Sequence, residues 1–158
     1  MRIDFEVNGK PHALEADPGE MLLPVLRRLG FWSVKHGCET GDCGACLVLV
    51  DGEPTLACLF PAPRAGGRKV TTVEGLGDTE SLHPLQREFL SHGAVQCGYC
   101  TPAMLLAAAA LLRRNPHPTA AEVREALAGV LCRCTGYVKP VEAIQAVAEG
   151  QGRPAGGA

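Results

Sequence analysis

The chain has 158 residues, a length that suits one ordinary domain or two small ones. Hydrophobic residues make up 46% of it and charged residues 20%, a composition that argues against wholesale disorder. Residues 1–75 hold eight Lys and Arg against ten Asp and Glu, and residues 76–158 hold seven of each. Because neither half is strongly basic, a nucleic-acid partner is not indicated.

No segment predicts a membrane span, since the longest apolar run, residues 103–112, is half the length that a bilayer needs. The opening residues, MRIDFEVNGK, alternate between apolar and polar and lack the apolar segment of a signal peptide. We therefore expect a cytoplasmic protein. In that reducing compartment, eight clustered cysteines indicate metal binding rather than disulfides.

The first half of the chain predicts a mostly β unit. Asn8-Gly9 lies between two alternating segments and is a strong hairpin signal. The expected elements, in chain order, are strands over 2–7 and 10–15, a helix over 20–29, an irregular loop over 36–46, and strands over 47–50, 55–58 and 69–73.

The second half becomes helical after a polar linker. Thr101-Pro102 predicts an N-cap followed by Pro at the first helical position, and Thr119 with Glu122 predicts a capping box. Helices are expected over 82–91, 101–114, 119–131 and 140–149. The fold class is therefore α+β, with domains over residues 1–74 and 80–150 and a flexible Gly- and Pro-rich tail over 151–158.

The first four cysteines have the spacing C-x4-C-x2-C-x11-C, and three of them share one glycine-rich loop. The first two spacings match the plant-type 2Fe–2S run, and a hairpin after the loop would return the fourth cysteine to it. Zinc or a pair of disulfides are the alternatives, although zinc sites usually pair C-x2-C units. The candidate ligands are Cys38, Cys43, Cys46 and Cys58.

The other four cysteines have the spacing C-x2-C-x31-C-x-C. A helical hairpin with legs of about 18 Å and about 20 Å fills the long gap and brings both ends together. From spacing alone, structural zinc remains a serious alternative to a second cluster. The candidate ligands are Cys97, Cys100, Cys132 and Cys134.

Together the two sets resemble the iron–sulfur subunit of the molybdenum hydroxylases, the family of xanthine dehydrogenase, aldehyde oxidoreductase and carbon monoxide dehydrogenase. The matching stretches are SVKHGCETGDCGACLVLVDG, the returning Cys58, GAVQCGYCTPAML and LCRCTGY. The resemblance spans almost all of residues 2–149. It implies a plant-ferredoxin-like β-grasp domain, then a four-helix bundle, with one 2Fe–2S cluster in each.

The resemblance also implies partners. In such enzymes a large subunit holds molybdenum on a pterin, where water-derived oxygen enters a C–H bond of the substrate. Electrons then pass through both clusters, usually to FAD on a medium subunit, and the family suggests a dimer of heterotrimers. Gln96 matches a glutamine that binds the pterin, and Cys134 matches the ligand nearest the pterin amino group. No catalytic residue is expected on this chain.

One position departs from the family pattern, because Ala103 stands where Gly often follows Cys-Thr-Pro. Ala is the better helix former, so the departure casts little doubt on the cluster.

Two other functions compete with that of an electron-transfer subunit. One is a stand-alone iron–sulfur redox carrier or sensor, and the other is a structural module held by zinc or disulfides.

Overall fold

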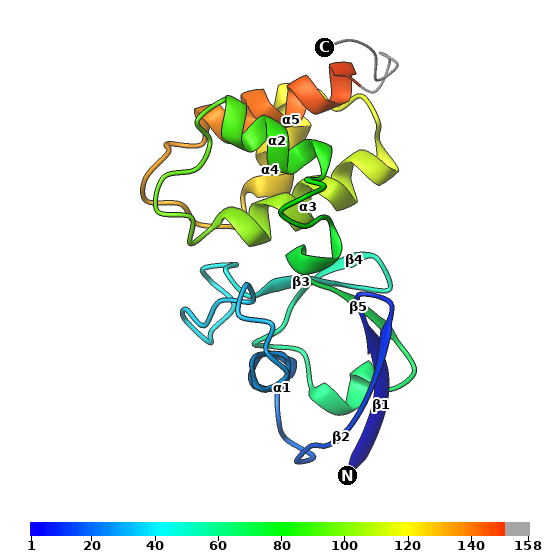
Figure 1. The fold of residues 1–158 in the computed structure, drawn as a ribbon. Helices are drawn as coiled ribbons and strands as arrows, with labels where there is room; N and C mark the ends of the chain where they lie inside the picture. The colour runs from blue at the N-terminus through cyan, green and yellow to red at the C-terminus, as the bar shows by residue number, and fades with distance from the viewer. Residues whose placement is uncertain (151–158) are drawn as a thin grey trace.

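The computed structural model describes residues 1–150, and the predicted tail over 151–158 lies outside the described residues. A sheet with α1 beside it forms one end of the molecule, and helices α2–α5 form the other (Figure 1). The strands are β1 (Arg2–Val7), β2 (Lys10–Glu15), β3 (Leu47–Val50), β4 (Glu53–Leu56) and β5 (Lys69–Thr71). The α-helices are α1 (Leu22–Arg28), α2 (Pro84–Ser91), α3 (Thr101–Arg114), α4 (Ala120–Leu127) and α5 (Val138–Gly150). The expected mixed α+β class is confirmed.

The sheet has the strand order β2-β1-β5-β3-β4. Strand β1 runs parallel to β5, and the other neighbouring strands are antiparallel. The Asn8-Gly9 hairpin is confirmed, and both turn residues have positive φ, as a two-residue turn between twisted strands requires. Ile3, Phe5 and Val7 point into the core from alternate positions of β1.

Some elements of the β half differ from expectation. Strand β4 ends at Leu56 and not at residue 58, because the tight Asp51-Gly52 turn already pairs Val50 with Glu53. Strand β5 stops at Thr71, where the chain enters a 3-10 turn over Val73–Gly75. A second 3-10 turn, Ala62–Ala65, occupies part of the expected loop.

The helical half also differs at its ends. Helix α4 begins with the predicted Thr119–Glu122 capping box but ends at Leu127, and the expected helix to residue 131 is wrong. The Leu131 N–H instead donates to the carbonyl of Cys43, at an N···O distance of 2.9 Å. Helix α3 begins at Thr101, so Cys100 and not Thr101 occupies the N-cap position.

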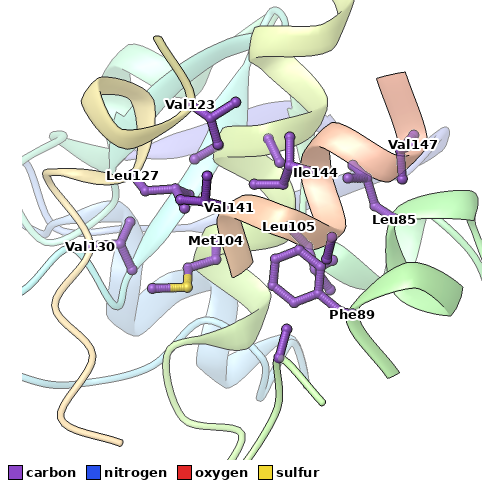
Figure 2. Close-up of a cluster of buried hydrophobic side chains, with 14 of the residues drawn as sticks. Leu85, Phe89, Met104, Leu105, Val123, Leu127, Val130, Val141, Ile144 and Val147 are labelled. Carbon is purple, nitrogen blue, oxygen red and sulfur yellow. The ribbon is translucent and has the colours of Figure 1, made fainter. Parts of the chain in front are cut away.

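Helices α2–α5 share one apolar core (Figure 2). Helix α2 packs along α5, and α3 packs along α4. Phe89, Met104 and Ile144 are among its largest fully buried side chains. Among residues 1–150, no helix is long and apolar enough to cross a membrane.

Helix α3 joins the two halves of the molecule. Leu106 and Ala110 pack on Leu49 of β3 in a small core of their own. At the end of α3, Arg113 Nη2 donates to the carbonyl of Gly52 at 2.6 Å. The helical part is therefore held against the β3–β4 face of the sheet, where strand β3 lies beneath α3 (Figure 1).

We expect Leu106→Ala to lower the free energy of unfolding by about 2–5 kcal/mol, since it leaves a cavity between α3 and β3. Leu90→Ala is the matched control, because Leu90 is 60% exposed on α2 whereas Leu106 is 1% exposed. The control should change this free energy by less than about 0.5 kcal/mol. Urea unfolding followed by circular dichroism measures both, and equal losses would contradict the proposed core contact.

Candidate functional site

The β3–β4 hairpin brings together the two ends of the first cysteine set. Cys46 directly precedes β3, and Cys58 follows β4 by two residues. Because Leu47 pairs with Leu56 in the hairpin, both cysteines lie at its open end. The Cys58 N–H donates to Cys46 Sγ at an N···S distance of 3.5 Å, and both side chains are buried.

The other two cysteines of this set form a second pair in the loop before β3. The Cys43 N–H donates to Cys38 Sγ at 3.3 Å, and the Thr40 N–H donates to the same sulfur at 3.4 Å. Both side chains are half-buried. The first set therefore consists of a buried pair, Cys46 and Cys58, and a more accessible pair, Cys38 and Cys43.

The two pairs differ in how readily they ionise. Hydrogen bonding from Thr40, together with the backbone N–H of Cys43, lowers the pKa of the Cys38 thiol to about 6. Burial raises the pKa of the Cys46 thiol to about 12. A buried thiol of this kind becomes a thiolate only when a bound cation offsets the cost of its charge.

The second set gathers where three helices end. Cys97 and Cys100 lie just before α3, and Cys132 and Cys134 lie between α4 and α5. All four border one cavity of about 420 Å³, which is also lined by Tyr99, Leu131, Arg133 and Gly136. The structure thus brings together the four cysteines that the helical hairpin was expected to unite.

These four cysteines also fall into pairs. The Cys132 thiol is close enough to raise the pKa of Cys100, after the larger effect of burial, and the Cys97 thiol raises the pKa of Cys134. Burial raises the pKa of the Cys100 thiol to about 12. Burial also opposes ionisation of Cys132, but hydrogen bonds from Thr135 outweigh it and lower this pKa to about 7. Cys97 and Cys134 are exposed, so the second set also has an inner and an outer pair.

Backbone N–H groups point at sulfur in both sets. Besides the donors to Cys38 and Cys46, the Tyr99 N–H lies 3.5 Å from Cys97 Sγ and the Thr135 N–H lies 3.4 Å from Cys132 Sγ. A Cβ on Gly37 would lie 2.7 Å from Cys43 Sγ, so this loop needs glycine to approach the thiol. Such donors stabilise negative charge on ligand sulfur.

The donor sets suit a centre with two metal ions. All eight cysteines lie in the described residues and are free of disulfide bonds. In a 2Fe–2S cluster each iron takes two protein ligands, so two thiol pairs are the arrangement that this cluster requires.

Gln96, which the family resemblance assigned to pterin contact, lies at the exposed rim of the second set. Its Nε2 donates to the carbonyl of Cys134 at 3.2 Å. Sequence reasoning missed Thr135 and Tyr137, whose hydroxyl groups contact Cys132. The stretch LCRCTGY contains both residues, but no spacing rule predicts those contacts.

The two cysteine loops touch each other. The hydrogen bond from Leu131 to Cys43 joins them, and Tyr99 Oη donates to the carbonyl of His36 at 2.8 Å. Gly44 faces the backbone of Gly129 so closely that a Cβ on Gly44 would overlap the carbonyl oxygen. The two candidate centres are therefore held at a fixed separation by backbone contacts.

Two different protein families match the two parts of the chain that carry the cysteine sets. Residues 5–70 match the 2Fe-2S iron-sulfur cluster binding domain, and residues 72–145 match the [2Fe-2S] binding domain. The small FeS subunit of nicotinate dehydrogenase from Eubacterium barkeri is 44% identical, over 93% of this chain and 94% of that protein.

Two solved structures are also similar. A chain of quinoline 2-oxidoreductase from Pseudomonas putida is 46% identical with a TM-score of 0.90, over 95% of this chain and 94% of that chain. The aldehyde oxidoreductase from Desulfovibrio desulfuricans is 42% identical with a TM-score of 0.90, over 93% of this chain but only 17% of that longer one.

We expect Gly44→Ala to weaken the contact between the two cysteine loops. Gly67→Ala is the matched control, because both glycines have φ near +70° but only Gly44 faces another backbone. Gly44→Ala should lose about 1–3 kcal/mol more stability than the control, since the loops must part. Urea unfolding and hydrogen exchange of the peptide carrying Leu131 measure this, and equal effects of the two substitutions would contradict it.

Proposed function

The chain belongs to the iron–sulfur small subunits of the molybdenum hydroxylase family, and from this premise we propose that it is an electron-transfer subunit with two 2Fe–2S clusters. The observation that carries the proposal is the division of each cysteine set into two thiol pairs. The proposed ligands of the first cluster are Cys38, Cys43, Cys46 and Cys58, and those of the second are Cys97, Cys100, Cys132 and Cys134.

We further propose that residues 1–74 form a plant-ferredoxin-like β-grasp domain and residues 80–150 a four-helix bundle. The strand order of the five-stranded sheet supports the first assignment, and the shared core of α2–α5 supports the second. The separate family matches over residues 5–70 and 72–145 support a boundary between them.

When bound, the clusters supply one-electron valence change at iron, and no side chain of this chain makes or breaks a bond. The protein's own groups hold and shield the centres. The inner pairs exclude water, as the buried Cys46 and Cys100 show. The N–H groups that point at the sulfurs stabilise the negative charge that reduction adds.

The exposed pair of the second centre fits a partner that supplies the substrate chemistry. Cys97, Cys134 and Gln96 lie together at the surface, where a large molybdopterin-binding subunit would contact them. In the aldehyde oxidoreductase from Desulfovibrio desulfuricans, the matching region is only 17% of a longer chain. We propose that separate subunits supply the remainder here, with FAD on a medium subunit, in a cytoplasmic dimer of heterotrimers.

Protein purified without air should contain two irons and two acid-labile sulfides for each of two clusters. Dithionite reduction should then give two distinct electron paramagnetic resonance signals. Cys43→Ser should remove one signal and half of the iron, and Cys132→Ser should remove the other signal. Stoichiometric zinc, or loss of both signals from either substitution, would contradict two independent clusters.

We expect Gln96→Ala to weaken coupling to the large subunit and leave both clusters assembled, because among residues 1–150 the Gln96 side chain is hydrogen-bonded only to the Cys134 carbonyl. Turnover of the complete complex should fall, while molybdenum content and both resonance signals persist. Iron analysis of the same preparation is the internal control. Loss of either cluster would show that Gln96 is needed for assembly of this subunit and not for contact with its partner.

A further inference from the structure

Tyr137 lies directly before α5 in an unusual backbone conformation. Its φ is 68°, in the left-handed region that bulky residues rarely adopt. The side chain is half-buried against the helical core, and its carbonyl accepts the Val141 N–H of α5 at 3.1 Å. Strained residues of this kind persist only where surrounding contacts enforce the conformation.

The hydroxyl of Tyr137 is hydrogen-bonded to the backbone of the loop that carries Cys132. The Cys132 N–H donates to Tyr137 Oη at 2.7 Å, and the hydroxyl donates to the Val130 carbonyl at 3.1 Å. The Tyr137 hydroxyl therefore forms hydrogen bonds with both the Cys132 N–H and the Val130 carbonyl. The Cys132 N–H is committed to this hydroxyl and does not point at sulfur.

The backbone of Tyr137 acts on Thr135. The Tyr137 N–H donates to Thr135 Oγ1 at 3.2 Å, and Thr135 Oγ1 lies 3.1 Å from Cys132 Sγ. Because this oxygen accepts a hydrogen bond from the Tyr137 N–H, its own proton can point at the sulfur, where a thiolate acts as the acceptor. The Thr135 N–H reaches the same sulfur at 3.4 Å.

We propose that Tyr137 is a positioning residue that sets the reduction potential of the second cluster, by holding two Thr135 donors on Cys132 Sγ. The inference rests on the proposed function, since it requires Cys132 to be a cluster ligand. Donors to ligand sulfur stabilise the more negative, reduced state and so raise the potential. Tyr137 acts on the sulfur through its neighbours, because its N–H reaches Thr135 and its hydroxyl holds the Cys132 backbone, which is why its role is one of position.

The test compares Tyr137→Phe, Thr135→Val and the double variant in the complete chain. Each cluster's potential is measured by redox titration with electron paramagnetic resonance. Both single variants should lower the potential of the second cluster, with the equilibrium constant for its reduction falling roughly threefold to tenfold, the size of one net hydrogen bond. The double variant should fall by less than the sum of the two single shifts, because Thr135→Val already removes one of the two donors that Tyr137 is proposed to hold in place.

Two controls separate this role from a general loss of structure. The first cluster of the same molecule should keep its potential. Thr55→Val removes a hydroxyl of β4 that donates to the Glu53 carbonyl, and it should leave the second cluster's potential unchanged. A first cluster that shifts as far as the second would overturn the proposal.

An unchanged second potential in Tyr137→Phe, with both clusters present, would also overturn it. So would a double variant whose shift is the sum of the two single ones. If Tyr137→Phe does not retain the cluster, Thr135→Val decides, and an unchanged potential there counts against the inference. Unmodified protein without iron would instead overturn the proposed function.

Discussion

The constraint on which the structure depends is that thiols from distant segments must meet in pairs. Cys46 meets Cys58 only because β3 and β4 form a tight hairpin whose open end holds both. Cys100 meets Cys132 only because α3 and α4 run out and back between them. In each half of the molecule, a pair of antiparallel elements, β3–β4 or α3–α4, brings together the cysteines at its two ends. The remaining elements stabilise that pair.

Each centre has an inner pair and a more accessible pair, and this gradient suits electron exchange. The inner pair, which is buried except for the half-buried Cys132, shields one side from water, while the accessible pair lets a partner approach the other. The contacts between Cys43 and Leu131, and between Gly44 and Gly129, hold the two centres to each other. A relay needs this fixed spacing more than it needs any reactive side chain.

Features set by neighbouring residues could be predicted from the sequence, and features set by distant contacts could not. The Asn8-Gly9 hairpin and the Thr119 capping box follow from local chemistry, and both are confirmed. The end of α4 could not be predicted, because the Leu131 N–H donates to the carbonyl of Cys43, which lies far away in the sequence. The cysteine spacing indicated which thiols would gather, but it contained no information on which would pair.

A threonine acts beside the backbone donors in each centre. In the first, the Thr40 side chain helps to lower the pKa of Cys38, and backbone N–H groups donate to Cys38 and Cys46 Sγ. In the second, the hydroxyl of Thr135 adds a side-chain donor to Cys132. Backbone donors follow from the fold and persist through most substitutions, whereas a side-chain donor changes with a single residue. Thr40 in the first centre and Thr135 in the second are therefore positions where sequence variation can tune a potential without altering the fold.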